Sequence, residues 1–418
     1  MYFIPGYLRE ELSENQLTIY SVLYGNKILL DTLERIEEYK KLKAKGTESL
    51  CTELECFLHE QKMLCNLEEL QDLQSVTCRK MSNQLGLTIM PTEGCNFRCP
   101  YCYEDHENAQ MTPEMVSAIK GFLEDQIPTV QEVNLSWFGG EPTLCPKVVL
   151  EISSFAQSFA KKLQGVKFSS SMTTNGYLLS KDIFLQYYAS GIRNYQITLD
   201  GFKHDETRYL ANKQGTLKTI LSNLKEIKEL NSEYEYKIIL RRNILASDDD
   251  LSWYDYLVQQ FDKDSRFSIL IRTVDNWGGE EVKELSIVEN KDRDRILKVH
   301  VDYAKSVGLV CENDIVDDGV SFGGQFCYAA YPKNFVFRAN GEIQKCTIAL
   351  KNGKNTVGRI IGNTVFIDDS LNKCWTPSLQ TTCISCKRIL SCMNKQCPKR
   401  VVLNEEGICC QTGRLERW

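Results

Sequence analysis

Three cysteines fall within eight consecutive positions of the stretch EGCNFRCPYCYED, residues 93–105. Cys95, Cys99 and Cys102 follow the spacing Cys-x3-Cys-x2-Cys, on a loop that also contains glycine, asparagine and proline. Thiolates are preferred ligands of zinc and of iron–sulfur clusters, and four of them form the usual complement. Three can surround one corner of a cubane cluster. The alternatives are three buried structural cysteines or part of a zinc site.

Cysteine is abundant in the whole chain, with 18 residues among 418, whereas histidine occurs 4 times. The shortage of histidine disfavours mixed Cys/His zinc sites and Cys–His nucleophilic catalysis. The start, MYFIPGYLRE, lacks a basic segment followed by a hydrophobic one, so we expect a cytoplasmic protein whose clustered thiolates hold metal or iron–sulfur clusters.

Overall composition is ordinary for a globular protein, with 42% hydrophobic and 25% charged residues. No apolar run approaches the roughly 20 residues that a membrane span needs. The net charge of −6 does not indicate a broad basic surface for nucleic acid. We therefore expect neither a membrane nor a nucleic-acid partner.

The middle of the chain alternates between strands and helices. Residues 85–92, 133–140, 166–176, 194–201, 236–244 and 267–274 are short runs rich in β-forming residues, and helical patterns such as 112–126 and 216–230 follow them. This order predicts an α/β fold with six parallel strands, curled into an open barrel or wound both ways. Cys95 and the glycine-rich FGGEP and TTNG turns fall at carboxyl strand ends, where parallel barrels place their chemistry.

The two ends of the chain have sequence patterns that differ from the middle and from each other. Residues 17–30 predict a hairpin that turns at Gly25–Asn26, and residues 31–45 and 66–76 carry helical periodicity, so a small mixed domain is expected there. From about residue 311 the chain is rich in cysteine and irregular, with short strands such as NFVFR and GEIQK.

The loop CNFRCPYC resembles the hallmark of radical S-adenosylmethionine (SAM) enzymes. Gly139, Gly140 and Glu141 stand where that family has its GGEP motif, and MTTNG (172–176) and TLDG (198–201) resemble its later motifs. The resemblance covers residues 85–310 and implies a partial (β/α)6 TIM-type barrel. It also implies that Cys95, Cys99 and Cys102 hold a 4Fe–4S cluster with one open iron, which SAM occupies.

The same resemblance assigns further contacts to SAM. The turn that ends in Glu141 would meet the amino group, Thr198 the ribose, Arg208 the carboxylate and Tyr101 the adenine, with Asn175 as another candidate. Other interpretations stay open: a plain strand-ending turn, an exposed arginine at a helix end, simple packing of Tyr101 and a turn role for Asn175. The sequence identifies no catalytic base, because Asp200 in TLDG could equally cap the next helix.

Nine cysteines lie between residues 327 and 410. Read alone, they suit two zinc ribbons or two clusters. Their order resembles the SPASM extension of radical SAM enzymes, which holds two auxiliary 4Fe–4S clusters and would bring the total to three. By that resemblance the first auxiliary cluster takes Cys327, Cys346 and Cys397, and the second takes Cys383, Cys386, Cys392 and Cys410.

Two departures from the SPASM pattern matter. Four residues, not the usual three, separate Cys392 from Cys397. Some relatives carry an additional cysteine shortly after the first SPASM cysteine, and none follows Cys327 in that neighbourhood here. The first auxiliary cluster could therefore have an open iron, or Cys374 or Cys409 could fill it. The remaining cysteines are expected to behave as small buried hydrophobic residues: Cys51, Cys56, Cys65, Cys78, Cys145 and Cys311.

SPASM-bearing radical enzymes mostly act on peptides, and the first domain resembles the leader-binding domain of peptide maturases. The alternative is that this first domain is only a structural cap on the barrel. The resemblance implies an enzyme of the sactisynthase type, which abstracts hydrogen from a ribosomally synthesised precursor through a 5′-deoxyadenosyl radical and forms a cysteine thioether. It also implies a small electron donor such as a flavodoxin or ferredoxin. The expected domains are 1–84 for the leader, 85–310 for the barrel and 311–418 for the auxiliary clusters.

Several other functions remain compatible with the sequence. Carbon–carbon crosslinking and epimerisation begin with the same hydrogen abstraction. A sulfatase maturase that makes formylglycine would not need the first domain. A peptide-binding cluster protein without catalysis is the alternative from a different class, and the intact three-cysteine loop with its GGEP turn disfavours it.

Overall fold

The computed structural model describes residues 1–21, 23–106, 109–261, 264–279, 281–314, 327–376, 384 and 397–403, without the side chains of 73–80, 314, 400 and 401. The chain forms two compact units. One comprises residues 1–82, 317–332 and 373–418, and the other comprises residues 83–316 and 333–372. Each unit is described by itself below.

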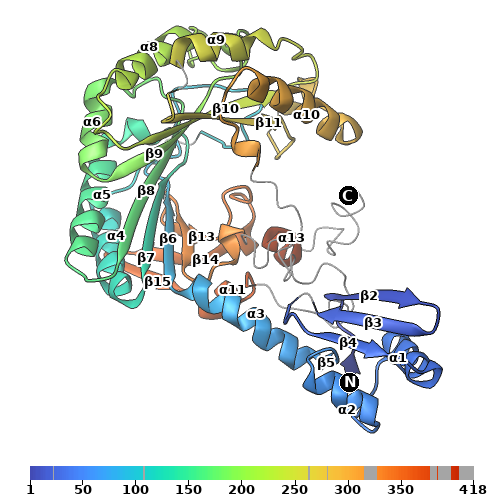
Figure 1. The fold of residues 1–418 in the computed structure, drawn as a ribbon. Coiled ribbons are helices and arrows are strands. Elements are labelled where there is room, and N and C mark those ends of the chain that lie inside the picture. The colour runs from blue at the N-terminus through green and yellow to red at the C-terminus, as the bar shows by residue number, and fades with distance from the viewer. Residues whose placement is uncertain are drawn as a thin grey trace. The chain divides into compact units, whose positions relative to one another are not determined.

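The first unit contains a three-stranded antiparallel sheet in the order β2-β3-β4, together with several helices (Figure 1). The predicted hairpin is confirmed, because the Ser21 amide donates to the carbonyl of Asn26 across the turn (2.9 Å). Ile19, Tyr39 and Leu58 are buried between sheet and helices. The elements are β1 Tyr2–Phe3, β2 Leu8–Ser13, β3 Gln16–Ser21, β4 Lys27–Leu30, α1 Leu33–Lys45, α2 Glu53–Glu60, β5 Cys65–Asn66, α3 Leu67–Ser82 and α13 Pro398–Val402.

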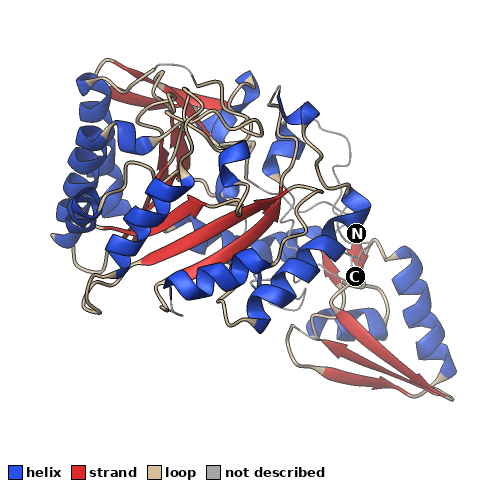
Figure 2. Ribbon diagram, turned by 90° about the horizontal axis from the view of Figure 1, so that it is seen from above, coloured by secondary structure: helices blue, strands red, loops and turns tan. Residues whose placement is uncertain are grey.

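The second unit is built on six parallel strands, which confirms the predicted partial barrel. Neighbouring strands follow the chain order from β6 to β11. Helices cover the outer side of the curved sheet (Figures 1 and 2). The strands are β6 Gln84–Ile89, β7 Glu132–Trp137, β8 Lys167–Thr174, β9 Ile192–Thr198, β10 Lys237–Ile244 and β11 Phe267–Thr273. The helices are α4 Pro113–Gln126, α5 Pro146–Lys161, α6 Lys181–Ala189, α7 His204–Thr207, α8 Leu217–Lys228, α9 Ser252–Phe261 and α10 Asn290–Ser306.

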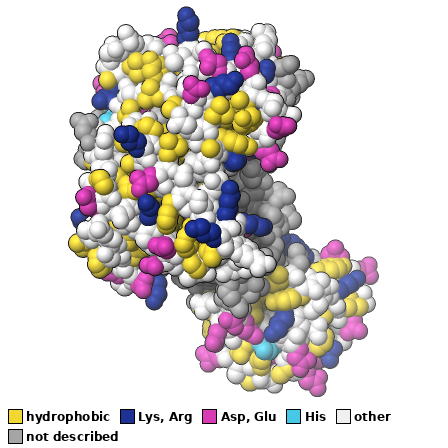
Figure 3. Space-filling model, turned by 90° about the vertical axis from the view of Figure 1, so that its left-hand side faces the viewer, with side chains coloured by type: hydrophobic (Ala, Val, Ile, Leu, Met, Phe, Trp, Pro, Cys, Tyr) yellow, Lys and Arg dark blue, Asp and Glu magenta, His cyan; other side chains and the backbone are white. Residues whose placement is uncertain are grey.

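The barrel helices are amphipathic, and this explains how they pack on the sheet. In α8, Ile220, Leu224 and Ile227 are spaced three or four residues apart and are buried against the strands, while lysines occupy the other side. The outer surface mixes positive and negative side chains among scattered hydrophobic ones (Figure 3). No helix in the described part of the chain is long and apolar enough to cross a bilayer.

The barrel sheet continues beyond its first strand. β12 (Asn334–Phe337) pairs with β6 in parallel, and β13 (Glu342–Gln344), β14 (Thr356–Ile361) and β15 (Thr364–Ile367) follow as antiparallel neighbours. A short helix, α11 (Asp369–Lys373), comes next. These strands come from the segment that the sequence assigned to the auxiliary-cluster region. As a result, β6 is an interior strand of a ten-stranded sheet.

Candidate active site

The three predicted cluster ligands lie on the loop between β6 and α4. Cys95, Cys99 and Cys102 are all half-buried, and the Cys102 amide donates to the carbonyl of Cys99 (2.9 Å). Burial raises the pKa of each thiol, and that of Cys102 reaches about 12, with Glu104 and Cys99 adding to the effect. Three neighbouring neutral thiols become thiolates when a cation compensates their charge, which is the behaviour of metal ligands.

The number of these thiols suits a cluster with one open position. Thiolates are the usual ligands of iron–sulfur clusters, and a cubane takes four of them. Three thiols on one loop, at Cys95, Cys99 and Cys102, match this chemistry with one iron left free of protein ligands, and the cluster itself stays a prediction.

The glycine pair that follows β7 lies directly against the loop that carries the three cysteines, which we call the cluster loop. A Cβ added to Gly140 would come 2.2 Å from the carbonyl oxygen of Gly94, and one on Gly139 would come 2.5 Å from that of Thr92. Amides of the same turn donate into the loop, from Gly140 to Thr92 (3.2 Å) and from Glu141 to Gly94 (3.0 Å). Both glycines are thus required for close docking of the cluster loop on β7.

Glu141 is a buried anchor between two strand ends. Its carboxylate accepts hydrogen bonds from the Thr143 amide (3.0 Å) and hydroxyl (2.6 Å), from the Thr174 hydroxyl (2.7 Å) and from the Asn175 amide (2.7 Å). Burial raises the pKa of Glu141, and these hydrogen bonds oppose the shift. Because both oxygens already have protein donors, the carboxylate holds the ends of β7 and β8 together. A contact with the SAM amino group stays a prediction for this turn.

Asn175 connects β8 to the cluster loop. Its side-chain amide donates to Oδ1 of Asn96 (2.8 Å), and its own Oδ1 accepts from the Tyr177 amide (3.0 Å). Asn96 immediately follows Cys95, so the second and third strand ends both fix the loop that carries the thiols. Asn175 is therefore more than a turn residue, and its predicted contact with SAM is untested.

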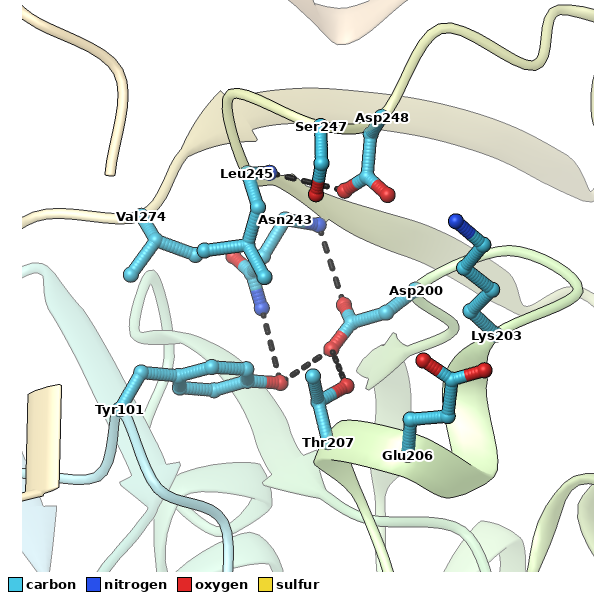
Figure 4. A pocket seen from close by; sticks show the side chains of 10 residues that line it. All are labelled: Tyr101, Asp200, Lys203, Glu206, Thr207, Asn243, Leu245, Ser247, Asp248 and Val274. Atoms are coloured by element: carbon cyan, nitrogen blue, oxygen red, sulfur yellow. Dashed lines mark hydrogen bonds between the residues drawn. The ribbon is translucent and has the colours of Figure 1, made fainter. Parts of the chain in front are cut away.

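Tyr101 joins the cluster loop to β9 and β10 (Figure 4). Its hydroxyl donates to Oδ2 of Asp200 and accepts from Nη1 of Arg208 (3.0 Å) and Nδ2 of Asn243 (3.4 Å). Oδ1 of Asp200 accepts from the Asn243 amide (3.1 Å), and Oδ2 also accepts from Thr207 (3.3 Å). Asp200, which the sequence left without a role, thus links the ends of two strands to the cluster loop.

Arg208 is buried at the end of α7, which excludes the exposed helix-end arginine that the sequence also allowed. Its guanidinium contacts Tyr101, and its charge lowers the pKa of Cys99 against the raising effect of burial. Nε of Arg208 is buried and has no partner among the described residues. One donor thus remains for an anion such as a carboxylate. Thr198, the last residue of β9, is also nearly buried.

A cavity of about 70 Å³ lies at the carboxyl ends of β9, β10 and β11. Asp200 lies at the centre of the lining residues and is joined by hydrogen bonds to Tyr101, Thr207 and Asn243 (Figure 4). Such a polar lining offers hydrogen bonds to hydroxyl-bearing ligands. The lining residues are Tyr101, Asp200, Lys203, Glu206, Thr207, Asn243, Leu245, Ser247, Asp248 and Val274.

A buried ion pair that sequence reasoning missed anchors the start of the cluster loop. Nε and Nη2 of Arg338, just past β12, donate to the two carboxylate oxygens of Glu93 (2.8 and 2.6 Å). Arg338 also donates to Glu342 (3.2 Å) and to the carbonyl of Leu350 (3.0 Å). No local sequence signal reveals this pair, because 245 residues separate its partners.

The auxiliary-cluster ligands are only partly visible. Cys346 is buried in the barrel unit, where Oδ1 of Asn355 accepts from its amide (2.9 Å) and Nδ2 donates to its carbonyl (2.8 Å). Cys327 and Cys397 belong to the other unit, half-buried and exposed respectively. The predicted ligands Cys383, Cys386, Cys392 and Cys410 and the alternative Cys409 lie outside the described residues. The predicted pairing of these cysteines remains open.

The non-ligand cysteines divide into two groups. Cys65, Cys145 and Cys311 are buried, as predicted. The prediction was wrong for Cys51 and Cys56, which are exposed. The first precedes the start of α2, and the second lies on the solvent side of that helix. The side chain of Cys78 is outside the described part of the chain.

Residues 89–243 match the sequence model of the Radical SAM superfamily. Among curated relatives, GTP 3′,8-cyclase of Campylobacter jejuni subsp. doylei is 28% identical over 172 residues, which cover 40% of this chain and 49% of the relative. The cysteine-type anaerobic sulfatase-maturating enzyme of Clostridium novyi is 28% identical over 170 residues, which cover 38% and 44%. The chain thus spans about half the length of the curated relatives it matches.

Two solved structures share the fold. The anSMEcpe structure with bound AdoMet and Kp18Cys peptide aligns with a TM-score of 0.53 at 16% identity, over 66% of this chain and 77% of that one. Streptococcus suis SuiB bound to precursor peptide SuiA aligns with a TM-score of 0.52 at 15% identity, over 98% and 100%. The solved structures show a likeness of fold, and residues 89–243, from the last residue of β6 into β10, match the Radical SAM superfamily.

Proposed function

We propose that this protein is a radical SAM peptide maturase that abstracts hydrogen from a ribosomally synthesised precursor and installs a crosslink, with a cysteine thioether as the first choice. The observation that carries the proposal is the set of contacts on the three-cysteine loop. The barrel holds this loop through Gly140, Asn175 and Arg338, next to the polar cavity of Tyr101. A three-cysteine loop fixed beside a polar cavity suits chemistry on a bound cofactor.

The chain's own residues have separate tasks in this proposal. A bound 4Fe–4S cluster and SAM would supply a 5′-deoxyadenosyl radical, which takes a hydrogen atom from the substrate. Cys95, Cys99 and Cys102 would hold the cluster. Arg208 offers its unpartnered Nε to the carboxylate of SAM, and Asp200 keeps Tyr101 in place at the cavity. A substrate bound over this cavity would exclude water and so protect a reactive species.

A polypeptide substrate is supported by the extent of the structural likeness. The alignment with SuiB, solved with its precursor peptide, includes nearly the whole of this chain, whereas that with anSMEcpe includes 66%. The first unit carries β4, which pairs only with β3 among the described strands. A leader segment could add to this edge as a further strand, since main-chain groups there offer hydrogen bonds.

Thioether formation is proposed through the auxiliary clusters. Cys327, Cys346 and Cys397 would hold the first auxiliary cluster, which would supply a place for a substrate thiolate and an acceptor for the electron released on bond formation. A small donor such as a flavodoxin or ferredoxin would supply the cleavage electron in the cytoplasm, where reducing conditions keep cluster thiols free. Carbon–carbon crosslinking and epimerisation use the same first step and are the nearest alternatives.

A sulfatase maturase is the second candidate. It is favoured by the 28% identity to the Clostridium novyi enzyme. The first unit argues against it, because such an enzyme does not need a separate leader-binding domain. Incubation of the loaded protein with a cysteine-containing sulfatase peptide separates the two: formylglycine in the product supports the second candidate and removes the first.

The cluster claim is tested on protein reconstituted without oxygen. Iron and sulfide should approach three cubane clusters, and reduced protein should cleave SAM. Joint replacement of Cys95, Cys99 and Cys102 by alanine should abolish cleavage. The control replaces the exposed Cys51 and Cys56, and should retain it. Cleavage by the triple variant, or bound zinc without iron, would refute the proposal.

The peptide claim is tested by co-expression with short coding sequences that neighbour the gene. A modified product should lose two hydrogen atoms for each crosslink. Thiol alkylation before and after reaction distinguishes sulfur from carbon attachment, because a thioether consumes a free thiol. A product with the mass loss but all thiols still reactive would replace the thioether by a carbon–carbon bond.

A further inference from the structure

The loop after the last barrel strand reaches the cluster loop across the barrel mouth. A Cβ on Gly279 would lie 2.4 Å from the carbonyl oxygen of Cys102, so the two backbones are in direct contact. β11 and β6, which precede these loops, lie at opposite ends of the six parallel strands. The contact therefore connects the first and last strand ends of the open barrel.

This loop is fixed on both sides of the contact. Arg293 of α10 forms an ion pair with Asp275, and the Gly278 amide donates to Oδ1 of Asn276 (2.9 Å). Farther along, the carbonyl of Ser286 accepts from the Ala246 amide (2.8 Å). These contacts tie the described part of the loop to α10 and to the segment after β10.

Trp277 is the residue that packing within the chain does not explain. It is 45% exposed, whereas each of the other described tryptophans, Trp137, Trp253 and Trp375, is 1% exposed. Phe202 is also exposed, but it packs edge-on against Trp253 with ring centroids 5.1 Å apart. Trp277 makes no ring contact with the described residues. An exposed indole is a common anchor for protein ligands, because its burial removes a large apolar area from water.

The cluster loop provides a second feature beside the same contact. Oε2 of Glu104 and Nδ1 of His106 are buried and have no hydrogen-bond partner among the described residues. Glu104 follows Cys102 by two positions. A buried polar atom without a partner is energetically costly, so such atoms usually serve a ligand or bound water. The free oxygen of Glu104 could accept a hydrogen bond from a peptide backbone N–H.

Trp277 lies two residues from Gly279, so its Cα is within about 7 Å of the backbone that touches Cys102. We propose that Trp277 and Glu104 contact the substrate polypeptide beside the cluster and select the segment to be modified. Trp277 packs against an apolar side chain of that segment, and Glu104 accepts one of its amide hydrogens. This inference rests on the proposed peptide substrate and adds the residues that position it.

The test uses full-length protein with Trp418 replaced by phenylalanine, so that Trp277 dominates quenching by acrylamide. The probe is a displayed library of random tryptophan-free peptides of about twelve residues, long enough to span a strand-like binding segment. Selected peptides should reduce the acrylamide quenching of Trp277. Trp277→Ala and Glu104→Met should each weaken their binding about fivefold to tenfold, with Trp277→Phe between them and the parent.

The matched control is Phe366→Ala, which removes an aromatic side chain that is 52% exposed on β15. It should bind the selected peptides as tightly as the parent protein does. Equal binding by Trp277→Ala, or a selection that yields no peptide able to shield Trp277, would overturn the inference. SAM cleavage by the loaded parent protein is measured separately, and its absence would refute the proposed function whatever the peptides do.

Discussion

Arg338 donates two parallel hydrogen bonds to Glu93, from Nε and Nη2 to the two carboxylate oxygens. One partner lies two residues before the first cluster cysteine, and the other follows β12. Both side chains are largely buried, with exposed fractions of 12% and 7%. The pair is thus a fixed connection between the cluster loop and the strand added beside β6.

Replacing Glu93 by glutamine should loosen the cluster loop. Glutamine keeps one acceptor but loses the charge, which leaves Arg338 partly uncompensated in a buried site. The free energy of unfolding, measured by urea denaturation of the second unit, should fall by about 3 kcal/mol. Reconstituted iron should fall as well. Arg359→Ala, which breaks an exposed pair with Glu342, should cost less than about 1 kcal/mol. Equal effects of both variants would contradict the view that the buried pair of Glu93 and Arg338 fixes the cluster loop.

Gly140→Ala should reduce cluster retention without a change in any thiol. The added Cβ would lie 2.2 Å from the carbonyl oxygen of Gly94, so the turn and the cluster loop must separate. Iron content and the visible absorbance of the cluster measure this loss. Gly121→Ala is the control, because nothing lies within 4 Å of its Cβ on α4. That variant should gain about 0.5–1 kcal/mol in stability. Full iron loading of Gly140→Ala would argue against close docking.

Asp200→Asn should weaken SAM binding. The amide group cannot accept from both Tyr101 and Asn243 as the carboxylate does, so Tyr101 loses its fixed position. We expect the dissociation constant for SAM to rise about tenfold, because hydrogen bonds to charged groups contribute about 1.5–3 kcal/mol. Equilibrium dialysis measures the constant at equal cluster loading. The exposed Asp249→Asn variant serves as the control. An unchanged constant would restrict Asp200 to capping the following segment.

His300 should make stability depend on pH. Burial lowers the pKa of its imidazole to about 4, and the charge of Arg242 adds to the effect. Tyr254 donates to or accepts from Nδ1 (2.8 Å), and the carbonyl of Asp248 lies 3.2 Å from Nε2. The neutral ring suits this site, so its contribution to stability is present above the unfolded pKa of about 6.5 and is lost as pH falls toward 4.

The pH effect is measured by urea midpoints between pH 7 and pH 4. His300→Gln keeps a neutral polar group of similar reach, so its stability should fall less steeply over this range. A parallel decline in both proteins would assign the effect to other groups. Tyr303 contacts Asp255 on the neighbouring helix, and the conservative Tyr303→Phe variant tests whether that pair contributes.

The parts of the fold with strong local patterns could be predicted from the sequence. The six parallel strands, the hairpin at Gly25 and the loop that carries Cys95 all follow from residues that are close in the chain. The addition of β12 to β6 could not, because it pairs Asn334 with Gly86 and depends on contacts between distant segments. Short apolar runs such as NFVFR carry no information about which edge they join.

The candidate site shows the same division. Motif resemblance identified Tyr101 and Arg208, which the structure brings together through one hydrogen bond (3.0 Å). It attributed Gly140 and Glu141 to cofactor contact, whereas the structure first gives them the task of holding the cluster loop. Asp200 stayed without a role because its partners come from three separate segments. Such links depend on tertiary geometry, which spacing along the chain does not encode.

The interior position of β6 has a consequence for the order of events during synthesis. Until residues 334–338 have left the ribosome, one edge of β6 has no partner strand, and the carboxylate of Glu93 has no arginine with which to form its ion pair. An open strand edge next to unligated thiols favours misassociation and oxidation in the nascent chain. Stable insertion of the proposed cluster should therefore come late, after most of the chain has been translated, and slow translation would prolong the period in which this protein is most easily damaged.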